Sequence, residues 1–203
     1  MAYKRKIVTL VFITTSLLTL GWADSFEGIR AAAGNIQSIE ADFVQEKHMR
    51  ILARPLISKG HFVYKAPASL RWEYRHPMQR VMLMHKGDVR RFLQSEKGWA
   101  EDTASNLQPM DFVLQEISKW LNGRFDETPM FTASLAPENK IVLTPKESGM
   151  EQFIQRIEMV MADQPGIMKE VLIFESADSY TRFKFVTPKI NQPLAEAVFQ
   201  KVQ

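Results

Sequence analysis

The residues that could do chemistry are scattered along this 203-residue chain. Its four histidines (His48, His61, His76 and His85) show neither the H-x-H nor the H-E-x-x-H spacing of metal sites. We find no G-x-S-x-G elbow, phosphate-binding loop or dinucleotide fingerprint. The chain has no cysteine, which excludes thiol catalysis, disulfides and cysteine metal ligands. Most carboxylates alternate with apolar residues, as on a solvated strand face. The sequence therefore predicts a protein that is not an enzyme and holds no metal.

The apolar side chains form a clearer pattern. In Pro55–Pro77, large apolar side chains alternate with mostly polar ones on both sides of a turn. This period of two predicts two strands with one wet face and one aromatic face. The chain also has 11 Met and 13 Phe, and flexible Met suits surfaces that adapt to variable apolar partners. Plain core packing is the alternative. If the sheet is curved, its concave face is a candidate hydrophobic cavity, lined by Phe43, Phe62, Tyr64, Leu70, Trp72, Tyr74, Met82, Met84, Met110, Val113, Leu114 and Ile117.

Two helices and about ten strands are expected. The first helix spans Ser25–Asn35, and the second spans Met110–Leu121 and stops at Asn122-Gly123. Pro188 and Pro193 are expected to end the regular structure. Long successive antiparallel strands with few helices indicate a mainly β (α+β) fold, a strongly curved sheet or barrel with helices on one side. The expected strands are Ile39–Met49, two within Pro55–Pro77, Gln79–His85, Asp88–Leu93, Phe131–Leu135, Ile141–Thr144, Ile154–Ala162, Ile167–Glu175 and Thr181–Thr187.

Residues 1–23 have the pattern of a secretory signal peptide, which leaves 24–203 as one domain. A basic start precedes the apolar run Ile7–Leu20, which is short for a membrane span, and Gly21-Trp22-Ala23 suits cleavage. An uncleaved N-terminal anchor is the alternative. The segment carries three basic residues and no acidic one, so the remainder has 23 basic and 23 acidic residues. This balance gives no support to nucleic-acid binding.

The chain resembles the periplasmic outer-membrane lipoprotein carriers (LolA-like family) in motifs that follow one another in order. Each motif is moderately specific, and the shared order and spacing carry the resemblance. The matching segments are Asp42-Phe43-Val44-Gln45, the G-x-apolar-x-apolar-K-x-P segment Gly60-His61-Phe62-Val63-Tyr64-Lys65-Ala66-Pro67, Leu70-Arg71-Trp72 with Pro77, the hairpin residue Gly87, and Val142-Leu143-Thr144-Pro145-Lys146.

This resemblance implies a half-open antiparallel β-barrel whose short helices form a lid over a hydrophobic cavity. It implies a periplasmic protein of a Gram-negative bacterium, without cofactor, that carries lipoproteins from an inner-membrane release complex to an outer-membrane acceptor. We expect a monomer. Each exposed CH₂ costs about 0.8 kcal/mol in water, so a cargo with three chains of about 16 carbons has to be shielded.

One position departs from the family pattern. The carriers usually place an arginine just before the proline of K-x-P, where it hydrogen-bonds the lid closed, and here that residue is Ala66. The chain therefore lacks the family's latch residue at this position. The alternatives on the same fold are a specialised lipid or glycolipid carrier, an acceptor-like protein, and an envelope sensor that detects lipid or protein. An exported enzyme remains as a last alternative.

Overall fold

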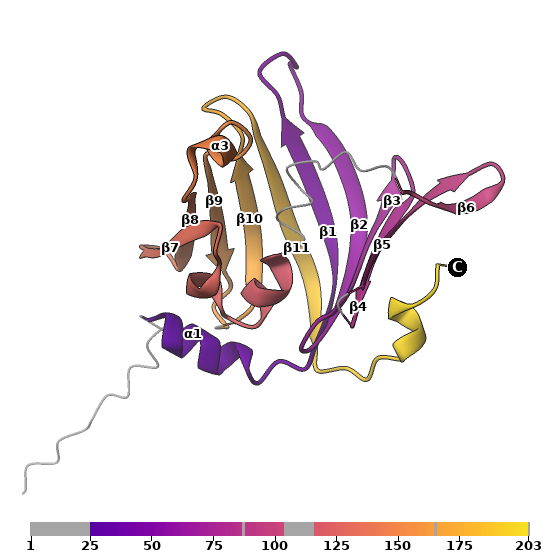
Figure 1. Ribbon diagram of the computed structural model, residues 1–203, viewed down its shortest axis with the longest axis horizontal. Helices are drawn as coiled ribbons and strands as arrows, with labels where there is room; N and C mark the ends of the chain where they lie inside the picture. Colours follow the sequence, from indigo (N-terminus) through magenta and orange to yellow (C-terminus); the bar gives the residue numbers. More distant parts are fainter. Residues whose placement is uncertain (1–24, 87, 104–115, 165, 203) are drawn as a thin grey trace, which may run out of the picture.

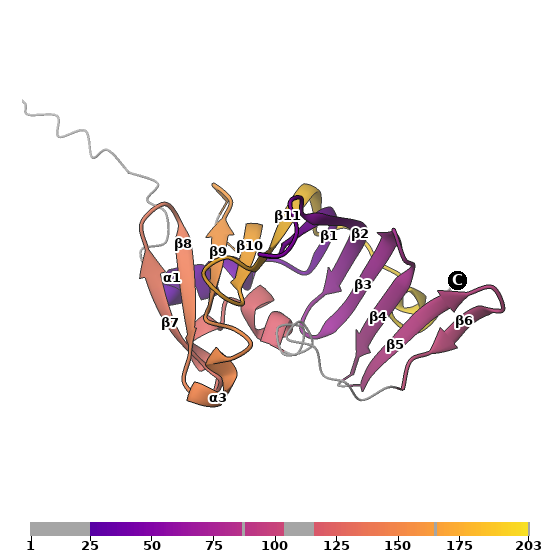
Figure 2. The ribbon, with the colours of Figure 1, turned by 90° about the horizontal axis from the view of Figure 1, so that it is seen from above.

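The computed structural model describes residues 25–86, 88–103, 116–164 and 166–202. In this part of the chain, eleven strands form one antiparallel sheet in the order β6-β5-β4-β3-β2-β1-β11-β10-β9-β8-β7. The sheet curves strongly but stays open, with β6 and β7 at its edges (Figures 1 and 2). The strands are β1 (Ser38–His48), β2 (Leu56–Lys65), β3 (Ser69–His76), β4 (Arg80–His85), β5 (Asp88–Ser95), β6 (Gly98–Glu101), β7 (Phe131–Ala136), β8 (Lys140–Pro145), β9 (Arg156–Met161), β10 (Met168–Phe174) and β11 (Tyr180–Ile190).

The mainly β class and the half-open antiparallel architecture are confirmed, and each expected strand has a counterpart. The sheet does not close into a barrel. Strand β6 was not expected, because its four residues, Gly98–Glu101, are too few to show a period. Several expectations lie outside the described residues: the signal peptide at 1–23, the hairpin residue Gly87, and the lid candidates Met110, Val113 and Leu114.

Strand β11 joins the two ends of the domain, because it pairs with β1 at the centre of the sheet. It continues through Pro188 to Ile190, so the expectation that Pro188 ends the regular structure is wrong. The register shifts beside this proline, opposite Glu40 and Asp42, and Thr187 has a φ of 48°. This irregularity accommodates a residue that cannot donate to the strand ladder.

Helix α1 (Phe26–Ala33) confirms the first expected helix and lies across one end of the sheet (Figure 1). The Ser25 hydroxyl accepts a hydrogen bond from the Gly28 backbone N–H at 3.1 Å and caps the helix. Its side chains Ile29 and Ala33 are buried, and Ile29 belongs to the concave core. The remaining short helices are η1 (Phe125–Glu127), α3 (Ser148–Glu151) and η2 (Glu196–Phe199).

The described end of the second expected helix, residues 116–121, also packs into the concave side of the sheet. Ile117, Trp120 and Leu121 are buried there, and the rings of Trp120 and Phe131 lie 6.3 Å apart. Gly123 follows with a φ of 71°, as the expected stop requires. A Cβ at Gly123 would come within 2.6 Å of the Arg30 Cα, so this glycine also lets the chain approach α1 closely.

The C-terminal segment covers part of the convex face. The Phe199 side chain is buried, and its ring stacks on His85 with centroids 6.4 Å apart. The Arg71 guanidinium donates to the Val198 and Lys201 carbonyl oxygens at 3.3 and 2.9 Å. Arg71 therefore holds this segment against the side of the sheet that faces away from the main core.

Among the described residues, no helix is long and apolar enough to cross a membrane.

Candidate hydrophobic binding site

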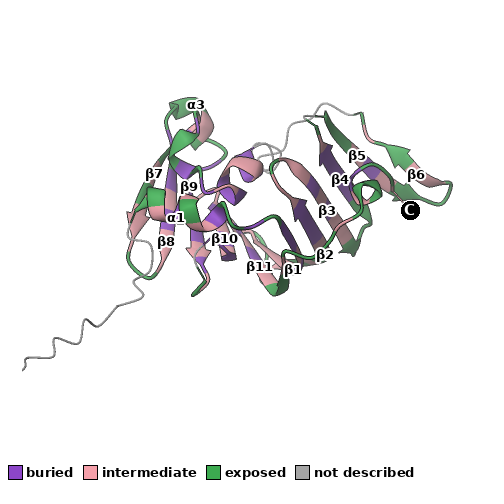
Figure 3. Cartoon of the chain, turned by 90° about the horizontal axis from the view of Figure 1, so that it is seen from below, coloured by how far each residue is buried: buried purple, intermediate pink, exposed green. Residues whose placement is uncertain are grey.

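The concave side of β1–β3 and β11 forms an aromatic wall centred on Trp72. This ring lies 4.7 Å from Phe43, 5.5 Å from Phe62, 5.4 Å from Phe183 and 6.1 Å from Phe185, measured between centroids. The contacts with Phe62, Phe183 and Phe185 are edge-to-face, the arrangement that ring quadrupoles favour. The alternation within Pro55–Pro77 thus places its large side chains on one continuous apolar surface, which Figure 3 shows as buried bands on the strands.

Gly60 makes room for this wall. It lies opposite Phe43 in the β1–β2 register. A Cβ built on Gly60 would come within 2.1 Å of the Glu73 carbonyl oxygen and 2.3 Å of the Phe43 ring. Phe43 can lie flat over β2 only because this position has no side chain, which gives the glycine of the G-x-apolar-x-apolar-K-x-P segment a physical role.

Tyr64 and Tyr74 contribute their rings to the wall, and their hydroxyl groups form hydrogen bonds at its edges. The Tyr74 hydroxyl donates to Gln45 Oε1 at 2.6 Å, and the Tyr64 hydroxyl donates to the Pro67 carbonyl oxygen at 3.1 Å. Burial raises the pKa of each phenol to about 12. Both hydroxyls therefore stay protonated at neutral pH, and the wall carries no charge from them.

Methionines extend the wall toward β5. Met82 lies opposite Trp72 and Met84 lies opposite Leu70 in the β3–β4 register, and all four are buried. Met thioethers adapt their shape more readily than branched side chains. This edge of the wall can therefore adjust to apolar groups of different shapes.

The helix at 116–121 covers the wall. Between helix and sheet lies an apolar cavity of about 20 Å³, enough for roughly one water molecule. Pockets for small-molecule ligands measure about 300–1,000 Å³. The cavity between the helix and the sheet is therefore too small for such a ligand. The cavity is lined by Ile39, Ala41, Phe62, Ile117, Leu121, Ile167, Met168, Phe185 and Pro188.

A hydrogen bond joins this helix to the turn between β2 and β3. The Asn122 side-chain amide donates to the Pro67 carbonyl oxygen at 2.8 Å and to the Ser118 carbonyl oxygen at 2.6 Å. Ala66 stands next to Pro67, where the carriers usually have arginine; its N–H donates to the Gln37 carbonyl oxygen at 2.9 Å. The helix and this turn are thus joined by a side chain that follows the helix, Asn122, and not by a side chain of the turn.

Glu73 and Glu158 lie on the convex side of the sheet, away from the wall. Glu73 accepts from Arg71 Nε at 2.8 Å and from Arg75 Nε at 3.1 Å. Burial opposes its ionisation, but the two arginines outweigh that effect and hold its pKa below the ordinary 4.5. The pKa of Glu158 is likewise lowered, by Arg156 and Lys140, against the effect of burial. Among the described residues, no cluster of three or more His, Asp or Glu could hold a metal ion.

The structure brings together the predicted lining residues that it describes. Phe43, Phe62, Tyr64, Leu70, Trp72, Tyr74, Met82, Met84 and Ile117 all belong to the concave core or pack against it. Whether they bind a ligand stays a prediction. Sequence reasoning missed Phe183, Phe185, Ile167 and Met168 as part of this surface. The alternation of Phe183 and Phe185 with Arg182 and Lys184 was visible, but the pairing of β11 with β1 was not.

Known proteins resemble this chain in sequence and in shape. The family model described as "Outer membrane lipoprotein carrier protein LolA" matches residues 34–202. An outer-membrane lipoprotein carrier protein of Helicobacter hepaticus is 31% identical over 80 residues, which make up 39% of this chain and 38% of that protein. The match thus spans little more than a third of this curated relative.

Three solved structures resemble the fold at TM-scores below 0.5. A DUF1329 family protein from Desulfovibrio piger has a TM-score of 0.47 at 11% identity, covering 86% of this chain and 96% of that one. A LolA superfamily protein from Nitrosomonas europaea has a TM-score of 0.44 at 10% identity, covering 88% and 99%. The MucA/MucB complex of Pseudomonas aeruginosa gives a TM-score of 0.43 at 15% identity, covering 87% and 60%.

Proposed function

This chain belongs to the outer membrane lipoprotein carrier family, whose model matches residues 34–202, and on that premise we propose that it is a periplasmic carrier that shields acyl chains. The observation that supports this most strongly is the aromatic and methionine wall on the concave side, centred on Trp72 and covered by the helix at 116–121. Acyl chains offer only apolar surface, so a wall of this kind can hold them without specific polar contacts.

Binding in this proposal requires the helix to move. The cavity of about 20 Å³ under Ile117 and Leu121 is far too small for an acyl chain. We expect the cargo to displace the helix from the wall and to replace its apolar contacts with contacts of its own. Because one apolar contact replaces another, uptake and release can be nearly balanced, as a shuttle requires.

The proposed role is binding rather than catalysis. The wall residues are aromatic, aliphatic and thioether groups, and Glu73 and Glu158 on the convex side are paired with arginine or lysine. We further propose that the carrier receives lipoproteins from an inner-membrane release complex and delivers them to an outer-membrane acceptor.

A specialised lipid carrier is the second candidate, and Ala66 is the observation that favours it. The helix at 116–121 is held to the β2–β3 turn through Asn122 rather than through a charged arginine. A neutral hydrogen bond contributes about 0.5–1.5 kcal/mol, against about 1.5–3 kcal/mol for one to a charged group. A cover held this way opens at a smaller cost and suits a cargo with fewer chains.

Native mass spectrometry of protein purified from the periplasm separates these candidates. Co-purified lipoprotein supports the carrier of lipoproteins, and co-purified free lipid supports the specialised lipid carrier. A stable complex with another protein, without lipid, would point to an envelope sensor instead. Recovery of the chain from the cytoplasm or with its first 23 residues intact in the membrane would contradict a periplasmic carrier.

A further inference from the structure

The hairpin between β1 and β2 projects from the end of the sheet opposite α1 (Figure 1). Its loop, residues 49–55, carries Ile51 at the tip with 83% of its surface exposed. Leu52, Leu56 and Ile57 beside it are also exposed, so this hairpin holds four of the eight large apolar residues that are exposed in the described part of the chain. Such a concentration on one projection is unusual for a surface that meets only water.

Hydrogen bonds and a ring contact hold the loop in one conformation, which fixes the position of these exposed apolar side chains. The Leu52 N–H donates to the Met49 carbonyl oxygen at 2.9 Å and closes a turn around Arg50 and Ile51. The Arg50 N–H donates to the Ser179 hydroxyl of the neighbouring loop at 3.3 Å. At the base, the His48 and Tyr180 rings stack with centroids 4.3 Å apart.

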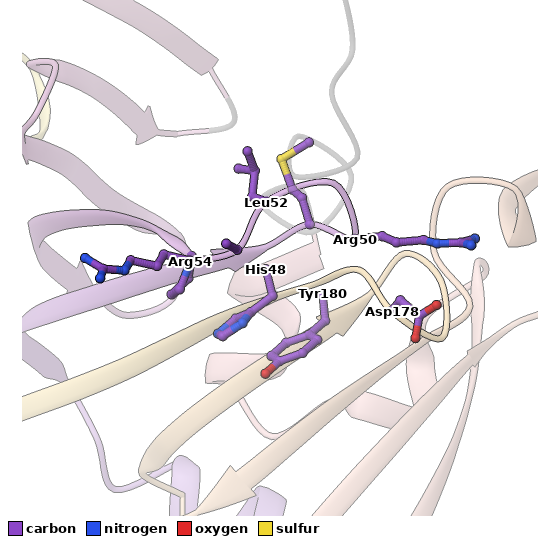
Figure 4. Close-up of a pocket in the computed structure, with 9 residues that line it drawn as sticks. His48, Arg50, Leu52, Arg54, Asp178 and Tyr180 are labelled. Atoms are coloured by element: carbon purple, nitrogen blue, oxygen red, sulfur yellow. The ribbon is translucent and has the colours of Figure 1, made fainter.

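The charged residues of the loop itself, Arg50 and Arg54, are both basic. No Asp or Glu occurs between Glu46 and Glu73 in the sequence. Arg50 and Arg54 flank the apolar pair, and neither guanidinium forms an ion pair with any residue that the structure describes. Figure 4 shows the two side chains pointing to opposite sides of the loop, with Leu52 projecting outward between them. The two arginines line a shallow pocket together with Asp178, an acid on the neighbouring loop between β10 and β11.

We propose that this loop docks on an anionic phospholipid bilayer. Two arginines that diverge cannot grip one small anion together, but they can each meet a different phosphate of a surface. Ile51 and Leu52 between them would enter the boundary between headgroups and acyl chains, as apolar side chains of interfacial segments do. This contact would bring the end of the sheet opposite α1 to the membrane, and it does not depend on what the concave wall binds.

The contact should be weak and reversible. Each basic residue near an anionic surface strengthens binding by about fivefold, and salt screens that gain. Two arginines and two aliphatic side chains therefore provide an attachment that a shuttling protein can leave. Neutral phosphatidylcholine offers the apolar part alone, so the loop should prefer phosphatidylglycerol.

A single fluorophore tests this docking. Because the chain has no cysteine, Ile51→Cys gives one site for a polarity-sensitive label in the purified protein. We expect a blue shift on phosphatidylglycerol vesicles, a much smaller one on phosphatidylcholine vesicles, and reversal in high salt. Val89→Cys is the matched control. Val89 is apolar and 49% exposed, but it lies near the start of β5, at the other end of the sheet, so its label should not respond.

A second variant tests the arginines without a label. Arg50→Gln with Arg54→Gln should weaken vesicle flotation on phosphatidylglycerol by roughly 25-fold, from about fivefold for each residue. The affinity of the concave wall for a free hydrophobic dye, measured separately, should stay unchanged. The proposal is overturned if the Ile51 label does not respond, if it responds equally to both lipids, if the Val89 label responds as strongly, or if the double variant floats like the parent. None of these results bears on acyl binding, which the dye reports separately.

Discussion

The side-chain amide of Asn122 donates a hydrogen bond to the Pro67 carbonyl oxygen at 2.8 Å, joining the helix at 116–121 to the turn between β2 and β3. The two residues are 55 positions apart in sequence. The same carbonyl accepts from the Tyr64 hydroxyl, which belongs to the wall that the helix covers. One backbone oxygen therefore connects three parts of the molecule: the helix at 116–121, which is the cover of the wall, the turn beside Ala66, and the wall itself.

Replacing Asn122 with alanine should loosen the cover without unfolding the sheet. Loss of a hydrogen bond worth about 1 kcal/mol predicts roughly fivefold faster local opening, measured as amide hydrogen exchange at 116–121. Asn35→Ala is the matched control, because the Asn35 amide also donates to a carbonyl four residues earlier, that of Ala31, at the end of α1. If both variants change exchange at 116–121 equally, the bond to Pro67 does not hold the cover.

Replacing Gly60 with alanine should destabilise the whole domain. The new methyl group would overlap the Glu73 carbonyl oxygen and the Phe43 ring, and overpacking of this kind costs about 1–3 kcal/mol. Thermal unfolding measures the loss. Gly149→Ala in α3 is the control, because a Cβ there meets nothing within 4 Å. An unfolding temperature of Gly60→Ala equal to that of the control would show that Phe43 does not lie against this position.

Replacing Trp72 with alanine should weaken both stability and the binding of a hydrophobic dye, because the central ring of the wall is lost. Truncation of a buried aromatic residue costs about 3–5 kcal/mol, so binding is measured at a temperature where the variant remains folded. Phe174→Ala is the aromatic control on the convex side, where this ring lies under the Arg156 guanidinium at 3.6 Å. Equal loss of dye affinity in both variants would mean that the dye does not bind the wall.

Because Glu73 on the convex side is paired with arginines, we expect the stability of the fold to depend on pH. Arginines hold the pKa of Glu73 below the ordinary 4.5 in the folded protein, so ionised Glu73 stabilises the fold fully above that pH. The contribution disappears as the pH falls through the lowered folded-state pKa. The difference in unfolding temperature between the parent and Glu73→Gln should therefore be largest near pH 7 and shrink below pH 4.5.

Glu96→Gln serves as the control for this titration, since Glu96 is exposed on the loop between β5 and β6. Its difference from the parent should stay small throughout the pH range. A gap between the parent and Glu73→Gln that widens on acidification would contradict the assignment of the sign.

Much of the wall was predictable because strand alternation depends only on neighbouring residues. Trp72 and Tyr74 share a face that Arg71 and Glu73 do not, and the structure keeps that division. The pairing of β11 with β1 was not predictable, because it joins strands from opposite ends of the domain. Phe185 was therefore visible as an apolar strand residue but not as a neighbour of Trp72.

Contacts made by single polar groups across long separations were also invisible in the sequence. Nothing in the residues around Asn122 indicates that its amide reaches Pro67, and nothing near Phe199 indicates that its ring is buried on the convex face. The expectation for Pro188 was wrong because a strand can accommodate a proline at a bulge, and the β1–β11 register shifts beside it, between Glu40 and Asp42.

Displacement of a wall-bound dye by an acylated peptide tests the proposed carrier function most directly. The probe is a synthetic lipopeptide with long acyl chains at its N-terminus, compared with the same peptide without acyl chains. We expect the lipopeptide to displace the dye from the parent protein and the peptide without acyl chains to have no effect. The Trp72→Ala variant should bind the lipopeptide more weakly than the parent does. Failure of the lipopeptide to displace the dye, or equal displacement by both peptides, would contradict a carrier of acyl chains.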